Sequence, residues 1–109
     1  MRVQSHIWVA AFIRSESRDG AFATVVRKGS PEAGSIFLVH THRDGSCSVY
    51  APAPQALASD DLPGGRTFEL VHERVTQQAA QEWLDRQIAF DSDCWIVETE
   101  RGEGTPGLL

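Results

Sequence analysis

The stretch that decides the fold runs from Ser35 to Ala53 and reads SIFLVHTHRDGSCSVYAPA. A run of β-branched and aromatic residues leads into Asp44-Gly45, and a second such run ends at Pro52. These residue types are favoured in strands, and Asp-Gly between two such runs is a strong signal for a tight turn. We therefore predict a β-hairpin at the centre of the fold.

The rest of the chain predicts two helices and three further strands. We expect strands at 22–27, 67–75 and 94–100, and the clearest helix at 76–91, where Thr76 can cap the first turn. Segment 5–18 is open to two interpretations. Its apolar spacing and charged end favour a helix that stops at Gly20, whereas the unbroken apolar run 7–13 also fits a strand buried on both faces. The polar segment 55–65 is expected to form a loop.

Together these elements predict an α+β fold with about five short, mainly antiparallel strands in one sheet and both helices packed on one face. A chain of 109 residues has room for one hydrophobic core, so we expect a single domain over residues 1–101. Residues 102–109 have little to bury and are expected to form a disordered tail.

The composition excludes several classes of partner. The chain is 41% hydrophobic and 23% charged, as is usual for a globular protein, and its formal net charge is −5. That charge repels phosphate backbones and anionic lipids, so we expect neither nucleic acid nor a membrane as partner. No apolar run approaches the ~18 residues of a membrane span. Two cysteines are too few for a disulfide framework, and we predict a cytoplasmic protein.

The hairpin carries the candidate metal ligands His40, His42 and Cys47. If Asp44-Gly45 forms a two-residue turn, His42 pairs with Cys47, and strand alternation places all three side chains on one face. Imidazole and thiolate suit Zn²⁺. A three-residue turn with a bulge would instead reverse the faces after Gly45, and Cys47 would then be a small packed hydrophobe.

No catalytic residue and no cofactor are indicated by the sequence. Cys94 follows Asp93, and a carboxylate neighbour raises a thiol pKa, which is the wrong direction for a nucleophile. Trp8 and Phe12 are the candidate interaction residues. Large aromatic side chains are more often buried, so core packing is the first expectation for both. If the helix leaves them exposed, they would anchor another protein or a second copy of the chain.

Several short segments also occur together in an order that resembles a known family. They are Ile7–Val9, Gly20–Gly29, Pro31–Val39, Tyr50–Gln55 and Phe90–Glu98, which spread over nearly the whole chain. In this order the chain is similar to small alphaproteobacterial proteins grouped as a domain of unknown function. The resemblance implies a bacterial cytoplasmic protein, and it carries over no activity and no catalytic residue.

Two functional hypotheses follow from the sequence. The first is a non-enzymatic protein-interaction or accessory domain, which associates with itself or with another protein. The alternative is a small-molecule or metal-binding protein, or a minor enzyme, that uses the hairpin cluster of His40, His42 and Cys47.

Overall fold

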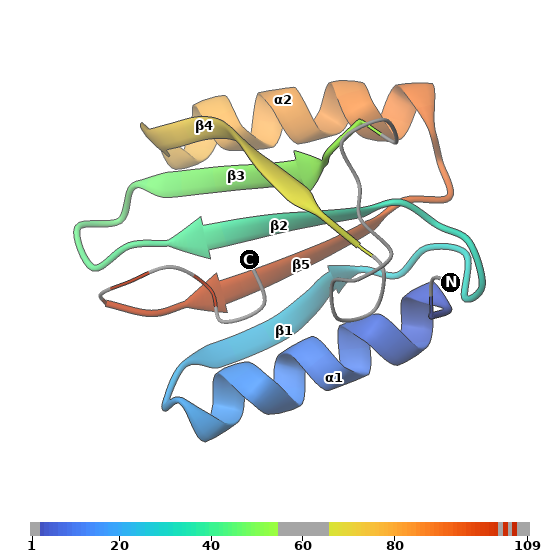
Figure 1. Cartoon of the computed structure of the whole chain (residues 1–109). Helices are drawn as coiled ribbons and strands as arrows, with labels where there is room; N and C mark the ends of the chain where they lie inside the picture. The colour runs from blue at the N-terminus through green and yellow to red at the C-terminus, as the bar shows by residue number, and fades with distance from the viewer. Residues whose placement is uncertain (1–2, 55–65, 103, 105, 107–109) are drawn as a thin grey trace.

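The computed structural model describes residues 3–54, 66–102, 104 and 106. Its elements, in chain order (Figure 1), are α1 (Ser5–Arg18), β1 (Phe22–Arg27), β2 (Ile36–Thr41), β3 (Cys47–Pro52), β4 (Phe68–Val75), α2 (Gln77–Phe90) and β5 (Trp95–Glu100). All predicted elements are present in the predicted order, and segment 5–18 is a helix. The predicted loop 55–65 lies outside the described residues.

The sheet is mixed, and its last strand in sequence lies in its interior. The strand order is β1-β5-β2-β3-β4, with β5 parallel to β2 and every other neighbouring pair antiparallel. Two helices and a mainly antiparallel five-stranded sheet confirm the predicted α+β class. The insertion of β5 between β1 and β2 makes β1 an edge strand.

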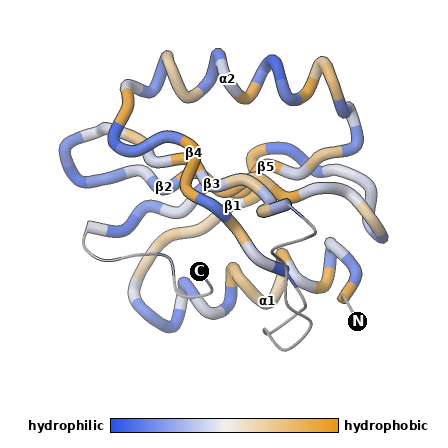
Figure 2. Tube along the Cα trace, turned by 45° about the horizontal axis from the view of Figure 1, so that its top comes forward, coloured by the Kyte–Doolittle hydropathy of each residue, from blue (hydrophilic) through white to orange (hydrophobic). Residues whose placement is uncertain are grey.

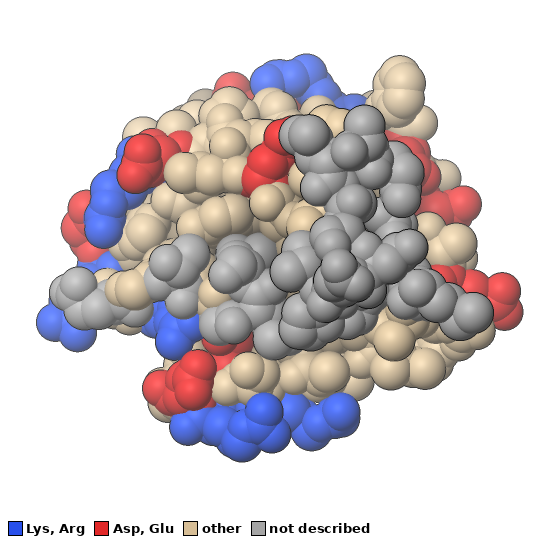
Figure 3. Space-filling model, viewed as in Figure 1, with Lys and Arg blue, Asp and Glu red and all other residues tan. Residues whose placement is uncertain are grey.

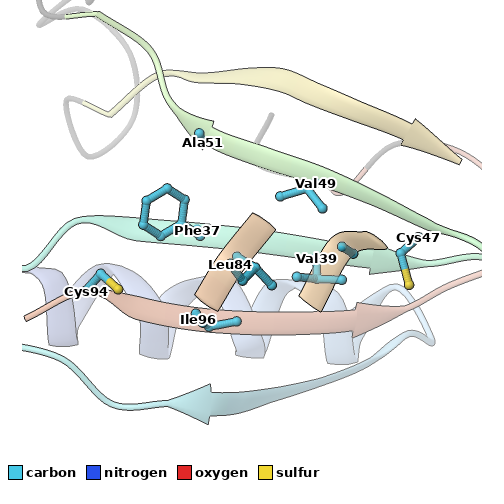
Figure 4. Packing of buried hydrophobic residues seen from close by; sticks show 9 residues of the cluster. Phe37, Val39, Cys47, Val49, Ala51, Leu84, Cys94 and Ile96 are labelled. Atoms are coloured by element: carbon cyan, nitrogen blue, oxygen red, sulfur yellow. The ribbon is translucent and has the colours of Figure 1, made fainter. Parts of the chain in front are cut away.

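The two helices cover opposite faces of the sheet, which corrects the prediction that both pack on one face (Figure 2). Alternate residues of β2 enter two separate clusters: Ile36 and Leu38 pack with α1, whereas Phe37 and Val39 pack with α2 (Figure 4). These four side chains are all buried. A strand that is apolar on both faces needs cover on both, because side chains alternate between faces along a strand. The result is a three-layer arrangement of helix, sheet and helix.

The turn between β1 and β2 supports the beginning of α1. The backbone N–H groups of Ser5 and His6 donate to the carbonyl oxygens of Glu32 and Pro31 at 3.1 and 2.9 Å. The first turn of a helix leaves such donors open, so the turn provides the acceptors that a side-chain cap would otherwise supply. The helix ends before Gly20, whose φ of 84° is the left-handed geometry that the sequence predicted for its stop.

A buried charged pair holds the other end of α1 to β5. The Glu16 side chain is fully buried, and its carboxylate accepts hydrogen bonds from Thr99 Oγ1 at 2.7 Å and from Arg101 Nη1 at 3.0 Å. A buried carboxylate is tolerated only when it is paired and hydrogen-bonded. This contact therefore fixes the end of the helix over the end of the strand.

The second helix forms as the sequence predicted. Thr76 Oγ1 accepts a hydrogen bond from the Ala79 N–H at 3.1 Å, which is the expected N-cap. Ala80 and Leu84 enter the cluster on the α2 face. α2 contacts chiefly β3 and β4, whereas α1 contacts β1 from the other face. The β1 end of the α2 face therefore lies beyond the helix.

The tail that the sequence predicted is described at three residues only: Gly102, Gly104 and Pro106. Pro106 is fully buried, which places that residue against the folded domain. The other residues of 102–109 lie outside the described part of the chain.

The outer surface carries mixed charge on the face shown in Figure 3. Basic side chains there lie in small groups among acidic ones. Within the described residues, neither helix is long and apolar enough to cross a membrane.

The connection between β1 and β2, residues 28–35, crosses the beginning of β5. The Ser30 N–H donates to the carbonyl oxygen of Asp93 at 2.9 Å, and Trp95 Nε1 donates to the carbonyl oxygen of Ser30 at 2.7 Å. A Cβ at Gly29 would meet the Asp93 carbonyl oxygen and lie 2.6 Å from the carbonyl carbon of Cys94. Only glycine lets two backbone segments approach this closely.

We expect Gly29→Ala to lower the free energy of unfolding by about 1–3 kcal/mol, because backbone and not a movable side chain must give way. Gly102→Ala is the matched control. Its new methyl group would meet only the end of the Arg43 side chain, so the change should stay within about 0.5 kcal/mol. Urea denaturation of both variants measures the difference, and equal midpoints would contradict the crossing as a constraint.

Candidate functional site

Exposed apolar side chains lie together with a sheet edge on β1. Phe22 and Val26 are 66% and 58% exposed, and Val25 is exposed as well. The polar exposed side chain of the strand is Thr24. We call these three apolar side chains, together with the outer backbone edge of β1, the β1 edge surface. Several exposed apolar side chains on one edge strand are a feature of interaction sites.

The register with β5 shows which face each side chain occupies. Phe22 lies opposite Glu100, and Val25 lies opposite Val97. Val97 belongs to the α1 cluster, so Val25 faces α1, while residues of β5 with the parity of Glu100 face α2. A register shift between Val25 and Arg27 adds one residue to β1, and Val26 turns toward the α2 face beside Ile96. Phe22 and Val26 therefore share the face that α2 leaves open.

A groove of about 390 Å³ separates β1 from α2 on this face. Its apolar lining includes Val26, Ile96 and Leu84, and glutamine side chains of α2 form the opposite wall. The acidic member of the lining is Glu98, whose Oε2 accepts a hydrogen bond from Thr41 Oγ1 at 3.2 Å. The groove is continuous with the β1 edge surface through Val26.

The hairpin forms with a different register from the two-residue turn considered first. Thr41 pairs with Cys47 and His40 with Ser48, and the His42 N–H donates to the Ser46 carbonyl oxygen at 2.8 Å. The loop therefore has three residues and ends at Gly45 with φ of 88°, which is the alternative that reverses the faces.

This register separates the three candidate metal ligands. Cys47 lies on the α2 side of the sheet with Val39 and Val49 (Figure 4), whereas His40 and His42 lie on the α1 side. Among the residues that the structure describes, no three His, Cys, Asp or Glu side chains gather closely enough to hold a metal ion. The structure thus brings the two histidines together and leaves the thiol apart from them.

The thiol environment does not favour a nucleophile. Burial raises the pKa of Cys47, and the nearby Glu98 carboxylate raises it further. Burial likewise raises the pKa of Cys94. Both sulfur atoms belong to the apolar cluster under α2. Each cysteine therefore packs as a small hydrophobic side chain.

The two histidines form part of a hydrogen-bonded cluster at the hairpin end of the sheet. Their rings lie 4.0 Å apart between centroids. His40 is buried and its Nε2–H donates to the carbonyl oxygen of Arg101 at 3.0 Å. His42 Nε2 and Ser48 Oγ are 2.7 Å apart and hydrogen-bonded, and the Arg74 N–H donates to Ser48 Oγ at 3.2 Å. Ser48 is itself buried, and its contact with the Arg74 N–H links β3 to β4. The His42–Ser48 pair therefore belongs to the packing of the hairpin against β4.

The candidate interaction residues Trp8 and Phe12 are buried, at 4% and 0% exposure. Their rings stack with centroids 5.2 Å apart, and Trp8 also contacts Phe68 of β4. The core alternative in the sequence is therefore the correct one for both residues. In the folded chain they are covered by the sheet and offer no docking surface.

Sequence reasoning missed the β1 edge surface. Residues 22–26 are mostly apolar and β-branched, a pattern that predicts a buried strand. The signal that could have found them was the absence of charge: no Asp, Glu, Lys or Arg occurs from Phe22 to Val26. A strand with this composition needs neighbours on both edges, and only the topology shows that it lacks one within the described chain.

The pKa of His42 generates a prediction about pH. Burial lowers this pKa below 6.5, and electrostatic interaction with His40 and Arg74 lowers it further, while Asp44 and Glu73 act in the opposite sense. The unfolded chain therefore takes up a proton at higher pH than the folded chain. Stability present above pH 6.5 should be lost as the pH falls from there through the lower, folded-state pKa.

His42→Gln should flatten this dependence, because the amide can still hydrogen-bond to Ser48 but does not titrate. Urea midpoints measured between about pH 7.5 and about pH 5.5 provide the comparison. The wild-type curve should fall more steeply than that of the variant. Parallel curves would show that His42 contributes nothing to the pH dependence.

Comparison with known proteins assigns the chain to a family. Residues 3–108 match the family described as "Protein of unknown function (DUF1491)". A solution structure of a protein from A. tumefaciens is 39% identical, with a TM-score of 0.85 over 99% of this chain and 93% of that one. An NMR structure of a family member from Caulobacter crescentus is 31% identical, with a TM-score of 0.79 over 99% and 94%.

A crystal structure of a family protein from Caulobacter crescentus is 28% identical, with a TM-score of 0.78 over 97% of this chain and 93% of that one. No curated protein matches the chain. The alphaproteobacterial resemblance carried by the sequence segments is confirmed, since both source organisms belong to that class. The chain belongs to the DUF1491 family of proteins of unknown function.

Proposed function

We propose that this chain is a protein-interaction domain that binds its partner through the β1 edge surface. The observation that carries the proposal is the exposure of Phe22, Val25 and Val26 on an edge strand. An edge strand offers unpaired N–H and C=O groups to an added strand, and exposed apolar side chains on it supply the contact area.

The contrast between the two edges of the sheet supports this choice. The exposed side chains of β4, the other edge, are Glu69, Leu70, Glu73 and Arg74, and three of these four are charged. Arg74 also takes a positive φ of 50°, which interrupts the regular strand. Charge and irregularity are the usual protection of an edge against pairing. From Phe22 to Val26, β1 carries no charged side chain.

Photo-crosslinking tests the surface without knowledge of the partner. A benzophenone amino acid placed at Phe22 in an alphaproteobacterial host should form covalent protein adducts on illumination. The same group at Asp85, an exposed position on α2, is the matched control and should form none. Adducts at both positions, or at neither, would contradict a specific role for β1.

A second candidate function is small-molecule binding in the groove. It is favoured by the apolar lining at Ile96 and Leu84 next to the Glu98 carboxylate, an arrangement that suits an apolar body with a cationic head. Titration with a long-chain alkylamine should then give saturable NMR shifts at these three residues. Shifts spread over the whole surface, or no saturation, would remove this candidate.

A further inference from the structure

We infer that the partner of the β1 edge surface is a second copy of this chain, paired antiparallel through β1 about a two-fold axis at Thr24. This inference rests on the proposed function and names its partner. The two sheets would join into one continuous sheet, with the two β1 strands at its centre.

The side-chain order of β1 is complementary to itself about Thr24. In this register Phe22 lies opposite Val26 of the second copy, and Ala23 lies opposite Val25 of the second copy. Directly opposed residues of antiparallel strands point to the same face, and their Cβ atoms lie roughly 4.5–5.5 Å apart. Phe22 and Val26 both face the open α2 side. Ala23 lies opposite Thr99 of β5 and Val25 lies opposite Val97, so both of these side chains face the α1 side.

Other registers of the same parity lose these contacts. A shift by two residues in one direction places Phe22 opposite Thr24, and a shift in the other places it opposite Lys28. Either shift removes the contacts between Phe22 and Val26. Among antiparallel registers of this parity, only the one centred on Thr24 pairs every exposed apolar side chain of β1 with another apolar side chain.

The charges at the ends of β1 favour the antiparallel direction. Lys28 follows the strand and Asp19 precedes it, and both are exposed. The register centred on Thr24 brings Lys28 toward Gly20 and Asp19 of the second copy, where Asp19 also lies 3.7 Å from Arg101 of its own chain. The two-fold axis repeats this attraction at the other end. A parallel pairing would instead place Lys28 beside Lys28, which costs free energy.

The arrangement also completes the groove. Val26 forms part of the groove wall at the β1 rim. Phe22 of the second copy would lie opposite Val26 and add an aromatic side chain to that rim. β1 is the outermost strand at this edge of the sheet, and α1 packs against it from the face opposite α2 (Figures 1 and 2). A second copy therefore covers apolar surface that a single chain leaves in water.

The expected dimer is weak. A strand of six residues is about 20 Å long, and the bulge after Val25 limits the regular ladder. Such a contact buries less than the ~800 Å² per partner of a standard interface. We therefore expect association that depends on concentration, rather than an obligate dimer.

Sedimentation equilibrium of the purified chain across a wide concentration series tests the partner. The wild type should show a monomer–dimer equilibrium. Val26→Lys should raise the dissociation constant by about tenfold or more, because two buried ammonium groups would face apolar side chains. Phe90→Glu is the matched control. Phe90 is 93% exposed but lies on α2, so the dissociation constant of this variant should equal that of the wild type.

Disulfide trapping tests the register. Thr24→Cys places two thiols at the axis, and an added oxidant such as oxidised glutathione should convert them to one intermolecular disulfide. Asp85→Cys is the control and should remain monomeric under the same conditions. The native Cys47 and Cys94 are 1% and 0% exposed and do not compete. Circular dichroism checks that each variant is folded.

The outcomes separate the two claims. A dimer that Val26→Lys weakens and Thr24→Cys traps supports the inference. A strict monomer that still forms adducts at Phe22 with a different protein overturns the inference and leaves the proposed function in place. A dimer unaffected by Val26→Lys, without trapping at Thr24, also overturns it. A monomer without adducts overturns both.

Discussion

The close crossing of residues 28–35 over the beginning of β5 is the constraint on which the rest of the fold depends. Because β5 enters between β1 and β2, the chain that joins those two strands must pass directly over Asp93. Glycine at positions 29 and 34 makes this possible, since a Cβ at either would meet the Asp93 carbonyl oxygen. The same turn offers two carbonyl groups to the first N–H groups of α1. One turn thus fixes the beginnings of β2, β5 and α1 relative to one another.

Free-energy magnitudes show why Trp8 and Phe12 belong to the core. Burying each ring stabilises the fold by roughly 1.5–3 kcal/mol, so exposing both to a partner would cost about 3–6 kcal/mol. A partner with micromolar affinity provides only about 8 kcal/mol in total. The cost of moving α1 off the sheet would offset much of this binding free energy, and the buried Glu16 carboxylate also holds the end of α1. A surface that is already exposed is the less costly place for an interaction.

The local part of the structure was predictable from the sequence, and the long-range part was not. The positions of the strands and of α2 follow from β-branched runs, from the Thr76 cap and from helical spacing, which are properties of neighbouring residues. The faces of the hairpin were not predictable, because one extra loop residue at Gly45 reverses every later side chain. For the same reason the sequence could not decide whether Cys47 shares a face with the two histidines. The insertion of β5 between β1 and β2 leaves no local signal at all.

That insertion also explains the character of β1. Without β5, β1 and β2 would be adjacent, and the composition of β1 is that of an interior strand: aromatic and β-branched, without charge from Phe22 to Val26. The topology nevertheless places it at the edge of the sheet, while the true protective features, Glu69, Glu73 and Arg74, lie on the opposite edge. A strand built for the interior but left at an edge gains most from a neighbour of the same kind. A second β1 strand, related to the first by a two-fold axis at Thr24, is such a neighbour, because the order of side chains along β1 then places apolar residues opposite one another.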